Sequence, residues 1–468
     1  MLENIHFYDS AWIGRPADGQ PTRFESLMYK SGVGECTTHS IKLRADVAFD
    51  PLLVEDSASF SSDLSAGASE YEFARELERL FSTRNTLHIG LGITSEQADV
   101  LNHCRYRCLS TLPHCTPPAN TYQLDLITVL RAINLLRPPG DELLVDPFAA
   151  TSVIHSQLLA RFPSVLAVDS IKQVMGHIQA QAPKLLKHSL GHTCVNQIQK
   201  SFGLESGQID SLGSVNPLLI VHESIGRRTF VCGFPIGVDP QDPHLVYMVD
   251  LQADLSDLAE DGSENVQRFV RQDPNDRTKP IFTLDLTRIP FVCPLSAVDV
   301  QTAERLDIDK SVINHNVQLM RYQSELCLAM MDYSEAGRST KADPDYQLRS
   351  GDYSPQDLHL LEQLHKTEFS EWPALLDRAS DSRIKTLAWR LSCRAGASAP
   401  KRQAGDRWAA HCGSRLKAGL SVEQLSRRVQ FCKRVLEGPE SASPLGVRTA
   451  ALHWLSIMEV SNDIKSVV

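Results

Sequence analysis

The spacing of apolar residues changes twice along this chain, and this change limits the possible folds more than any other feature. Up to about residue 200 strand-like runs interleave with amphipathic helices, from about 205 to 335 short strands follow one another, and after 341 the pattern is helical. A chain of 468 residues is also too long for one ordinary hydrophobic core. We therefore expect three domains, α/β over 1–200, β-rich over 201–340 and helical over 341–468.

The expected elements follow from the same periodicities. Helical spacing in the first part predicts helices over 70–81, 125–136 and 169–184, beside short strands at 6–8 and 41–43. The middle part predicts strands at 218–221, 229–234, 245–251 and 281–284. The last part predicts helices over 355–364, 383–393, 422–436 and 449–460.

Composition points to a globular cytoplasmic protein, with 42% hydrophobic and 22% charged residues. The start has no basic flank and apolar stretch of the kind that marks a secretory signal, and no run approaches the roughly 20 apolar residues of a membrane span. We expect a monomer that contacts no membrane. Eleven cysteines, an odd number, favour reduced thiols over a disulfide framework.

One histidine and cysteine cluster allows two interpretations. His103, Cys104, Cys108, His114 and Cys115 offer ligands that zinc accepts, although their spacing is not one of the paired zinc patterns. Cys104 and Cys108 also lie four residues apart, which places them on one face of a helix.

Charge is segregated along the chain. The formal net charge is −10, yet residues 383–434 contain 13 Lys and Arg against two acids, Asp406 and Glu423. This stretch therefore carries +11 and the remainder −21. Such a surface can neutralise nucleic-acid phosphates and release counterions, or it can be the solvated face of a helical bundle.

Several segments carry a more specific signal because they occur in a fixed order. They are IHFYDSAWIG with QPTRF, GASEYEFARELERLF, LDLITVLRAINLLRP, NPLLIVHESIG, HLVYMVDLQADLSDL, CPLSAVDVQTAERLDID, DPDYQLRSGDYSPQD and DSRIKTLAWRLSCRAGASAP. Together they resemble the exonuclease I family over nearly the whole chain. The resemblance implies an α/β + β + α fold: an RNase H-like exonuclease domain of the DEDDh type, an SH3-like β domain and a helical C-terminal domain.

The resemblance also implies a clamp around single-stranded DNA and removal of nucleotides from a 3′ end. That chemistry needs four carboxylates around two divalent ions, for which Mg²⁺ is the expected cofactor, and a histidine that takes a proton. Family members also bind the acidic tail of single-stranded DNA-binding protein. Lys310 and Arg321 fall on family-like positions for that partner.

Most of the implied catalytic residues are replaced. Asp9 stands at the first acid position of the opening strand, but Ala11 stands at the second, two residues later on the same strand face. Gln97 falls at the acid position of the second motif. A shift of register by one or two residues would bring Glu96 or Asp99 there instead.

The third motif keeps its acid and loses its histidine. Ser164 stands where the histidine is expected and Asp169 where the acid is expected. His155 is the nearest alternative histidine, but it lies nine residues upstream and needs a rearranged loop to reach the site. We expect Asp9 and Asp169 to hold at most one weakly bound ion, so that turnover is absent or severely impaired.

DNA binding does not depend on these carboxylates. In the basic segment cationic and aromatic side chains interleave in the way that a single-strand channel requires. The predicted DNA-binding residues, beside Trp408, are Arg383, Trp389, Arg390, Arg394, Lys401, Arg402 and Arg407.

Three functions remain open from the sequence. The first is a non-catalytic, exonuclease I-like protein that binds single-stranded DNA in repair, recombination or defence. The second is an active 3′→5′ exodeoxyribonuclease whose metal site is rebuilt from Asp9, Asp169 and either Glu96 or Asp99. The third is a protein–protein scaffold that no longer holds DNA.

Overall fold

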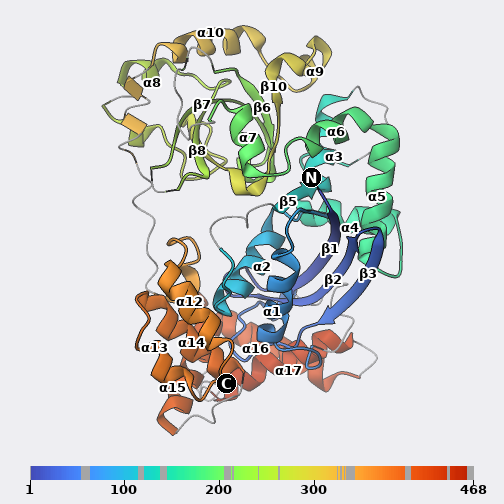
Figure 1. The fold of residues 1–468 in the computed structure, drawn as a ribbon, viewed down its shortest axis with the longest axis vertical. Helices are drawn as coiled ribbons and strands as arrows, with labels where there is room; N and C mark the ends of the chain where they lie inside the picture. The colour runs from blue at the N-terminus through green and yellow to red at the C-terminus, as the bar shows by residue number, and fades with distance from the viewer. Residues whose placement is uncertain are drawn as a thin grey trace.

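The computed structural model describes residues 2–53, 64–113, 121–137, 145–204, 212, 215–240, 242–261, 264–323, 325–326, 329–330, 333, 343–395, 402–439 and 443–460. Three parts are visible in Figure 1: a blue N-terminal sheet in the middle, a green and yellow β-rich part above it, and orange and red helices below. Within the described ranges no helix is both long and apolar enough to cross a membrane.

The N-terminal part is built on a five-stranded sheet with the order β3-β2-β1-β4-β5. The first three strands form an antiparallel meander, and β4 and β5 run parallel to β1. The strands are β1 (Asn4–Ile13), β2 (Gln20–Lys30), β3 (Val33–Ser40), β4 (Thr86–Gly90) and β5 (Thr121–Asp125).

Helices cover both faces of this sheet, because adjacent residues of β1 point in opposite directions. Phe7 packs with the helices of one face, and Tyr8 packs with those of the other. The Phe7 face is covered by α3 (Leu126–Leu136), α4 (Thr151–Arg161), α5 (Ala167–Gln181) and α6 (Pro183–Leu190). The Tyr8 face is covered by α1 (Glu70–Phe81) and α2 (Glu96–Arg107).

The middle part is a second five-stranded sheet, antiparallel throughout, with the order β10-β6-β7-β8-β9. Its strands are β6 (Leu218–Val221), β7 (Phe230–Val238), β8 (Leu245–Asp250), β9 (Ile281–Asp285) and β10 (Phe291–Pro294). The cores on its two faces also take in α7 (Val195–Ser201) on one side, and α8 (Ser256–Asp261), α9 (Val300–Arg305) and α10 (Lys310–Arg321) on the other.

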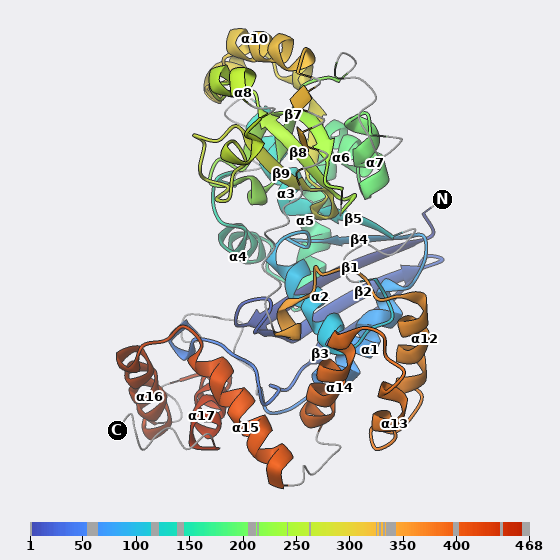
Figure 2. The ribbon, with the colours of Figure 1, turned by 90° about the vertical axis from the view of Figure 1, so that its left-hand side faces the viewer.

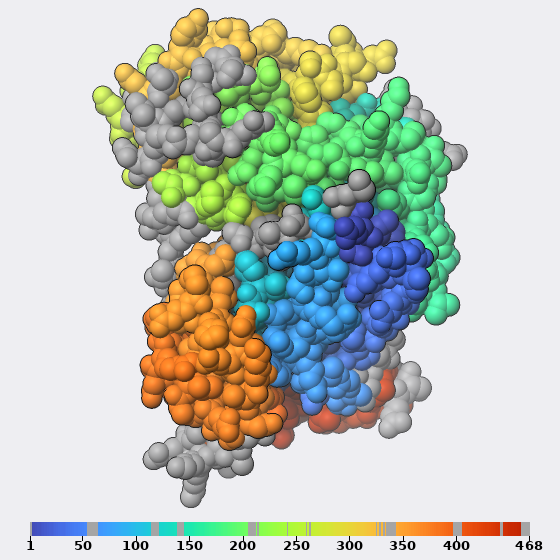
Figure 3. Space-filling model, in the orientation of Figure 1, coloured from blue at the N-terminus to red at the C-terminus, as the bar shows by residue number. Residues whose placement is uncertain are grey.

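The C-terminal helices divide between two places. One group packs onto the α1 and α2 side of the first sheet: α12 (Pro355–Leu364), α13 (Trp372–Leu376) and α14 (Ser382–Arg394). The other group forms a separate core with the loop after β3: α15 (Arg402–Lys417), α16 (Val422–Glu437) and α17 (Leu445–Val460). Figures 2 and 3 show the two groups wrapping the lower end of the N-terminal part.

The strongest sequence periodicities are confirmed by the structure. The helices over 70–81 and 355–364 and the strand at 218–221 have the predicted bounds. The helix predicted over 169–184 runs past the break at Ala182 into α6, and the other predicted helices and middle strands differ only at their ends. The expected strand at 41–43 is wrong, because Ile41 makes only an isolated bridge to Ala68. The expected strand at 6–8 is much longer, since β1 runs for 10 residues beside β2.

Candidate functional site

Asp9 lies near the centre of β1, on the sheet face that α4 and α5 cover. Its Oδ1 atom is 2.9 Å from Nε2 of His155, and their side chains are 13% and 24% exposed. Burial alone would lower the pKa of His155, but the charge and hydrogen bond of Asp9 outweigh it and raise that pKa. The expectation that His155 needs a rearranged loop is therefore wrong, because α4 carries it to Asp9 directly.

Glu25 is a second carboxylate at this site, and the sequence analysis missed it. It is the cross-strand partner of Asp9 in the β1–β2 register, so the two side chains share one sheet face. Glu25 is 2% exposed, and its Oε2 atom accepts a hydrogen bond of 2.6 Å from the backbone N–H of Ala167, at the start of α5. Burial raises the pKa of Glu25, although the charge of Arg23 and the backbone hydrogen bonds at the start of α5 act to lower it. The sequence offered no signal for this pairing, because no strand over 20–30 was predicted.

Ala11, at the vacated acid position, faces Arg23 across the two strands. The Arg23 guanidinium forms an ion pair with Glu25 on the same face. A cationic side chain thus lies beside the position where the family resemblance predicts a second metal-binding acid.

The second motif occupies the first turn of α2. Gln97 is buried there, with its Nε2 atom unpaired among the described residues. Asp99 accepts two hydrogen bonds, of 2.8 and 2.7 Å, from the Arg288 guanidinium of the middle part. Glu96 lies close to Glu223 and Asp99, and burial with these like charges raises its pKa. Neither acid is seen in contact with Asp9.

Asp169 lies in the first turn of α5 and Ser164 in the exposed segment before that helix. No hydrogen bond or ion pair joins Asp169 to Asp9 in the described ranges, and neither belongs to a three-residue group of metal-binding side chains there. The residues present do not fit a two-ion site. Asp9 contacts His155, Glu25 accepts a hydrogen bond from the backbone at the start of α5, and a buried amide, Gln97, stands where the second motif is expected to have an acid.

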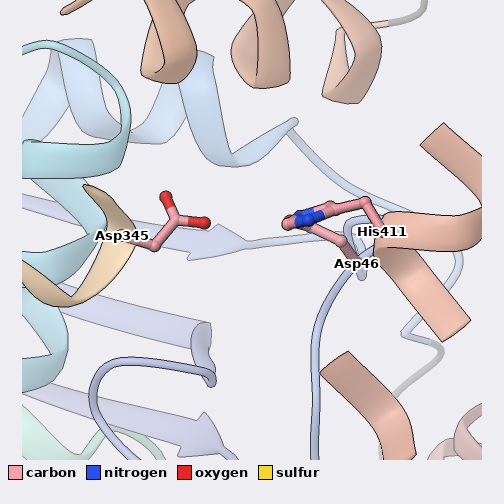
Figure 4. A group of neighbouring side chains, drawn as sticks. All are labelled: Asp46, Asp345 and His411. Atoms are coloured by element: carbon pink, nitrogen blue, oxygen red, sulfur yellow. The ribbon is translucent and has the colours of Figure 1, made fainter. Parts of the chain in front are cut away.

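The described residues contain one group of potential metal ligands, Asp46, Asp345 and His411, whose ligand atoms lie within 4.8 Å of one another (Figure 4). Four arginines already neutralise its two acids. Arg44 and Arg394 contact Asp46 at 3.0 and 2.7 Å, while Asp345 pairs with Arg394, Arg390 and Arg415. Burial would raise the pKa of Asp46, but these arginines hold it well below its usual range. This is an ion-pair network rather than a metal site.

The same network corrects part of the predicted DNA-binding set. Arg390 and Arg394 are buried on it, and Arg383 is buried on Asp381, with an Nη2 to Oδ2 distance of 2.7 Å, while it also donates to the backbone of Gln347 and Gly351. The sequence shows the charge of Arg390 and Arg394 but not that acids of other segments, Asp345 and Asp46, lie against them. The guanidinium groups of these two arginines and of Arg383 are therefore already paired with acids of the protein.

The other members of the predicted set remain at the surface or outside the described residues. The Arg407 guanidinium lies 4.2 Å from the centroid of the half-buried Trp389 ring, which meets Trp408 edge to face at 6.0 Å. Arg407 is exposed. Arg402 is the first residue of α15. Its side chain and the whole of Lys401 lie outside the described part of the chain.

Lys310 and Arg321, predicted to bind a protein partner, stand at opposite ends of α10. Eleven helical steps separate them by about 16 Å. The Lys310 ammonium donates to the Val298 carbonyl oxygen at 2.6 Å. The structure thus places the two predicted residues at the two ends of one helix, with the Lys310 ammonium bound to a backbone oxygen.

The suggested zinc cluster gains no support from the structure. Cys104 and Cys108 are buried in the apolar core between α1, α2 and the C-terminal helices, where burial raises the pKa of the Cys104 thiol. His114 and Cys115 lie outside the described residues.

Comparison with known proteins identifies the same family twice in separate parts of the chain. The model of the exonuclease I SH3-like domain matches residues 208–332, and that of the exonuclease I C-terminal domain matches residues 342–443. Exodeoxyribonuclease I of Escherichia coli (strain K12) is 23% identical over 412 residues, which cover 83% of this chain and 84% of the relative. The Haemophilus influenzae enzyme is 20% identical over 340 residues, 68% of this chain and 69% of its own.

Solved structures agree over nearly the full length. A zinc-bound complex of E. coli exonuclease I with single-stranded DNA aligns with a TM-score of 0.77 at 19% identity, covering 98% of this chain and 100% of the other. A further exonuclease I structure reaches a TM-score of 0.79 at 18% identity, covering 98% and 99%. The fold is thus an RNase H-like exonuclease domain, an SH3-like β domain and a helical C-terminal domain. The chain is a member of the exonuclease I family.

Proposed function

We propose that this protein binds single-stranded DNA as its relatives do, and that its 3′→5′ exonuclease activity is lost or severely impaired. One observation carries the proposal. At the position of the family's metal site, the acids Asp9 and Glu25 face His155 and Arg23, which are cationic or able to become so.

The charge balance explains the expected loss. Mg²⁺ is attracted by an excess of hard carboxylate oxygens. Here Asp9 contacts an imidazole at 2.9 Å, and Glu25 forms an ion pair with Arg23 and accepts a hydrogen bond from the backbone at the start of α5. Gln97 supplies an amide instead of an acid. Loss of a positioned general base alone costs roughly 10²- to 10⁴-fold in rate, and an incomplete ion site adds to that loss.

Two lines support DNA binding. Solved relatives of the same fold include a complex of E. coli exonuclease I with a dA16 oligonucleotide. In this chain Arg407, Trp389 and Trp408 form a surface cation and ring cluster, the chemistry that stacks unpaired bases. A partner resembling single-stranded DNA-binding protein stays part of the proposal, through Lys310 and Arg321.

The decisive experiment follows binding and degradation together. A labelled single strand is titrated with protein at several salt concentrations, and the same strand is incubated with Mg²⁺ or Mn²⁺. We expect binding that weakens as salt rises, with no metal-dependent release of nucleotides. Release that is abolished by Asp9→Ala would overturn the proposed loss of activity. Failure to bind even at low salt would identify the protein as a scaffold.

An active enzyme is the second candidate, because Glu25 and His155 both lie beside Asp9. A rebuilt site would have to use these groups, since Asp99 is bound by Arg288. An active enzyme would be favoured if Asp9→Ala and Glu25→Gln both abolish the release of nucleotides while Asp99→Asn retains it.

The proposal includes three domains with boundaries near residues 200 and 340. Limited proteolysis provides the test. Cleavage confined to these two regions, giving stable fragments of the N-terminal, middle and C-terminal parts, is the expected result.

A further inference from the structure

The middle part contains a cavity of about 380 Å³ that the family's nuclease chemistry does not use. It lies between the end of β8, the segment before β7 and the start of α10. Figure 1 shows these elements in its upper part. Two arginines, three aspartates and three further residues line it: Arg228, Arg277, Asp250, Asp307, Asp309, Gln252, Ala253 and Val312. The volume falls in the range of small-ligand sites.

The inner acid of this cavity is already occupied. Asp250 is 2% exposed and accepts a hydrogen bond of 2.8 Å from Nη2 of Arg271, while its other oxygen accepts from the backbone N–H of Gln252 at 3.1 Å. Arg271 is not a lining residue, and it also donates to the Lys279 carbonyl oxygen at 2.6 Å. The Asp250 and Arg271 charges therefore satisfy each other.

The two lining arginines lack comparable partners. Arg277 is half-buried, and no hydrogen bond or ion pair joins its guanidinium to another described residue. Arg228 has one weak ion pair, 3.7 Å from Asp307, whose side chain is 92% exposed. Burial lowers the pKa of Arg277; the Asp250 carboxylate opposes this shift, while the neighbouring charges of Arg228 and Arg271 add to it. An anion would relieve this repulsion.

The rim limits what kind of anion fits. Asp307 and Asp309 both border the opening, and Asp309 uses its Oδ1 atom to cap α10 through Ser311 and Val312. A run of phosphodiesters would meet these acids and be repelled, whereas one phosphate group reaches the arginines and can leave amino or hydroxyl donors at the rim. Two guanidinium groups match a phosphate monoester, which carries close to two negative charges.

We infer that this cavity is a binding site for a single phosphate monoester, held by Arg228 and Arg277. The phosphate can belong to a free nucleoside monophosphate or to the 5′ end of a DNA strand. The cavity is separate from the Asp9 region, so the inference does not depend on whether the chain degrades DNA.

Calorimetric titration of the full chain tests the site with inorganic phosphate, dAMP, and an oligonucleotide with or without a 5′ phosphate. We expect saturable binding of dAMP or a preference for the 5′-phosphorylated strand. The ligand that binds more tightly shows whether the phosphate comes from a free nucleotide or from a DNA end. Arg277→Gln should weaken that binding at least about tenfold, because it removes a charge-assisted hydrogen-bond donor.

The matched control is Arg268→Gln, an exposed arginine of the same part that does not line the cavity. It should bind as the unchanged chain does. Thermal unfolding with and without phosphate separates misfolding from loss of the site, since the ligand should raise the Tm of the unchanged chain and not that of a folded Arg277→Gln. Absence of saturable binding of inorganic phosphate and dAMP together with equal binding of the two oligonucleotides, or equal weakening in both variants, would overturn the inference, whereas general binding of both oligonucleotides tests the proposed function alone.

Discussion

His6 and His88 lie side by side inside the N-terminal sheet, with their Nδ1 atoms 2.9 Å apart. Both are fully buried, and the Phe81 ring stacks on His88 at 4.8 Å. Burial lowers the pKa of His88 to about 3, and burial together with the neighbouring His88 lowers that of His6 well below its ordinary value. The contact requires one ring nitrogen to donate and the other to accept, so the two rings cannot both be protonated, and burial disfavours the charge on either ring.

The stability of the N-terminal part should therefore fall as the pH drops below about 6.5. The unfolded chain takes up these protons first, because each histidine has a lower pKa when folded, and each costs up to about 1.4 kcal/mol per pH unit. His88→Phe keeps the stacking shape and removes one titrating group. Urea unfolding between pH 7 and pH 5 should then show a shallower loss of stability, and an unchanged slope would contradict this assignment.

Arg407 is the exposed cation of the predicted DNA-binding set, and it should contribute to binding through phosphate contact. Arg407→Gln is expected to weaken single-strand binding and to reduce the slope of log Kd against log salt by about 0.7. Arg434→Gln is the matched control, because Arg434 is also exposed and also lies over a ring, that of Phe431 on α16. Equal effects of the two substitutions would show that Arg407 contributes only to the overall positive charge of the C-terminal helices and makes no specific contact beside Trp389 and Trp408.

At the scale of elements, the buried network around Asp345 joins the short helical turn at Pro344–Tyr346 to α14 and α15. Asp345 is fully buried and pairs with three arginines. Burial would raise its pKa, but these arginines lower it further than burial raises it. The network fixes the C-terminal helices on the N-terminal part, since Arg394 also contacts Asp46.

Removing this acid should therefore be severe. Asp345→Asn leaves buried guanidinium groups without their charge partner and is expected to cost about 3 to 5 kcal/mol of unfolding free energy. The exposed pair of Asp377 and Lys385, 3.6 Å apart, gives the control, and Asp377→Asn should cost under about 1 kcal/mol. Urea unfolding of both variants measures the difference, and similar losses would show that the network contributes little.

Across the whole molecule, three parts of the chain meet at one joint. Arg288 of the middle part binds Asp99 and the Ser95 carbonyl oxygen of α2, and Arg349 from the C-terminal part contacts Asp285 at 2.8 Å. These charge-assisted bonds hold the first turn of α2 against the β-rich part.

Loss of this joint should loosen α2 without unfolding the chain. Arg288→Gln is expected to raise hydrogen exchange in the first turn of α2 by about tenfold or more, the equivalent of roughly 1.5 to 3 kcal/mol in lost charged hydrogen bonds. Arg305→Gln, which removes contacts with the end of α3 instead, is the control. Unchanged exchange at 95–100 in Arg288→Gln would show that packing alone holds α2.

The fold was predictable where a single periodicity carried the signal. The helix over 70–81 has apolar residues on one face and a capping box at Ser69 and Glu72, so local sequence defines both its face and its start. The β2–β3 hairpin was missed because β3 is largely exposed and Val33 is its sole large apolar residue, which leaves little alternation to read. A strand of that kind forms because its neighbour offers hydrogen bonds.

By itself the sequence determined the family and the three-part architecture, and it predicted that acids are replaced at Ala11 and Gln97, because these depend on residue type and order. Only the tertiary structure decided what the remaining charges do. It brought His155 and Glu25 to Asp9, and it buried Arg394 on acids far away in the chain. A charge acts through its distance to other charges, and that distance is set by packing between segments that a linear pattern does not relate.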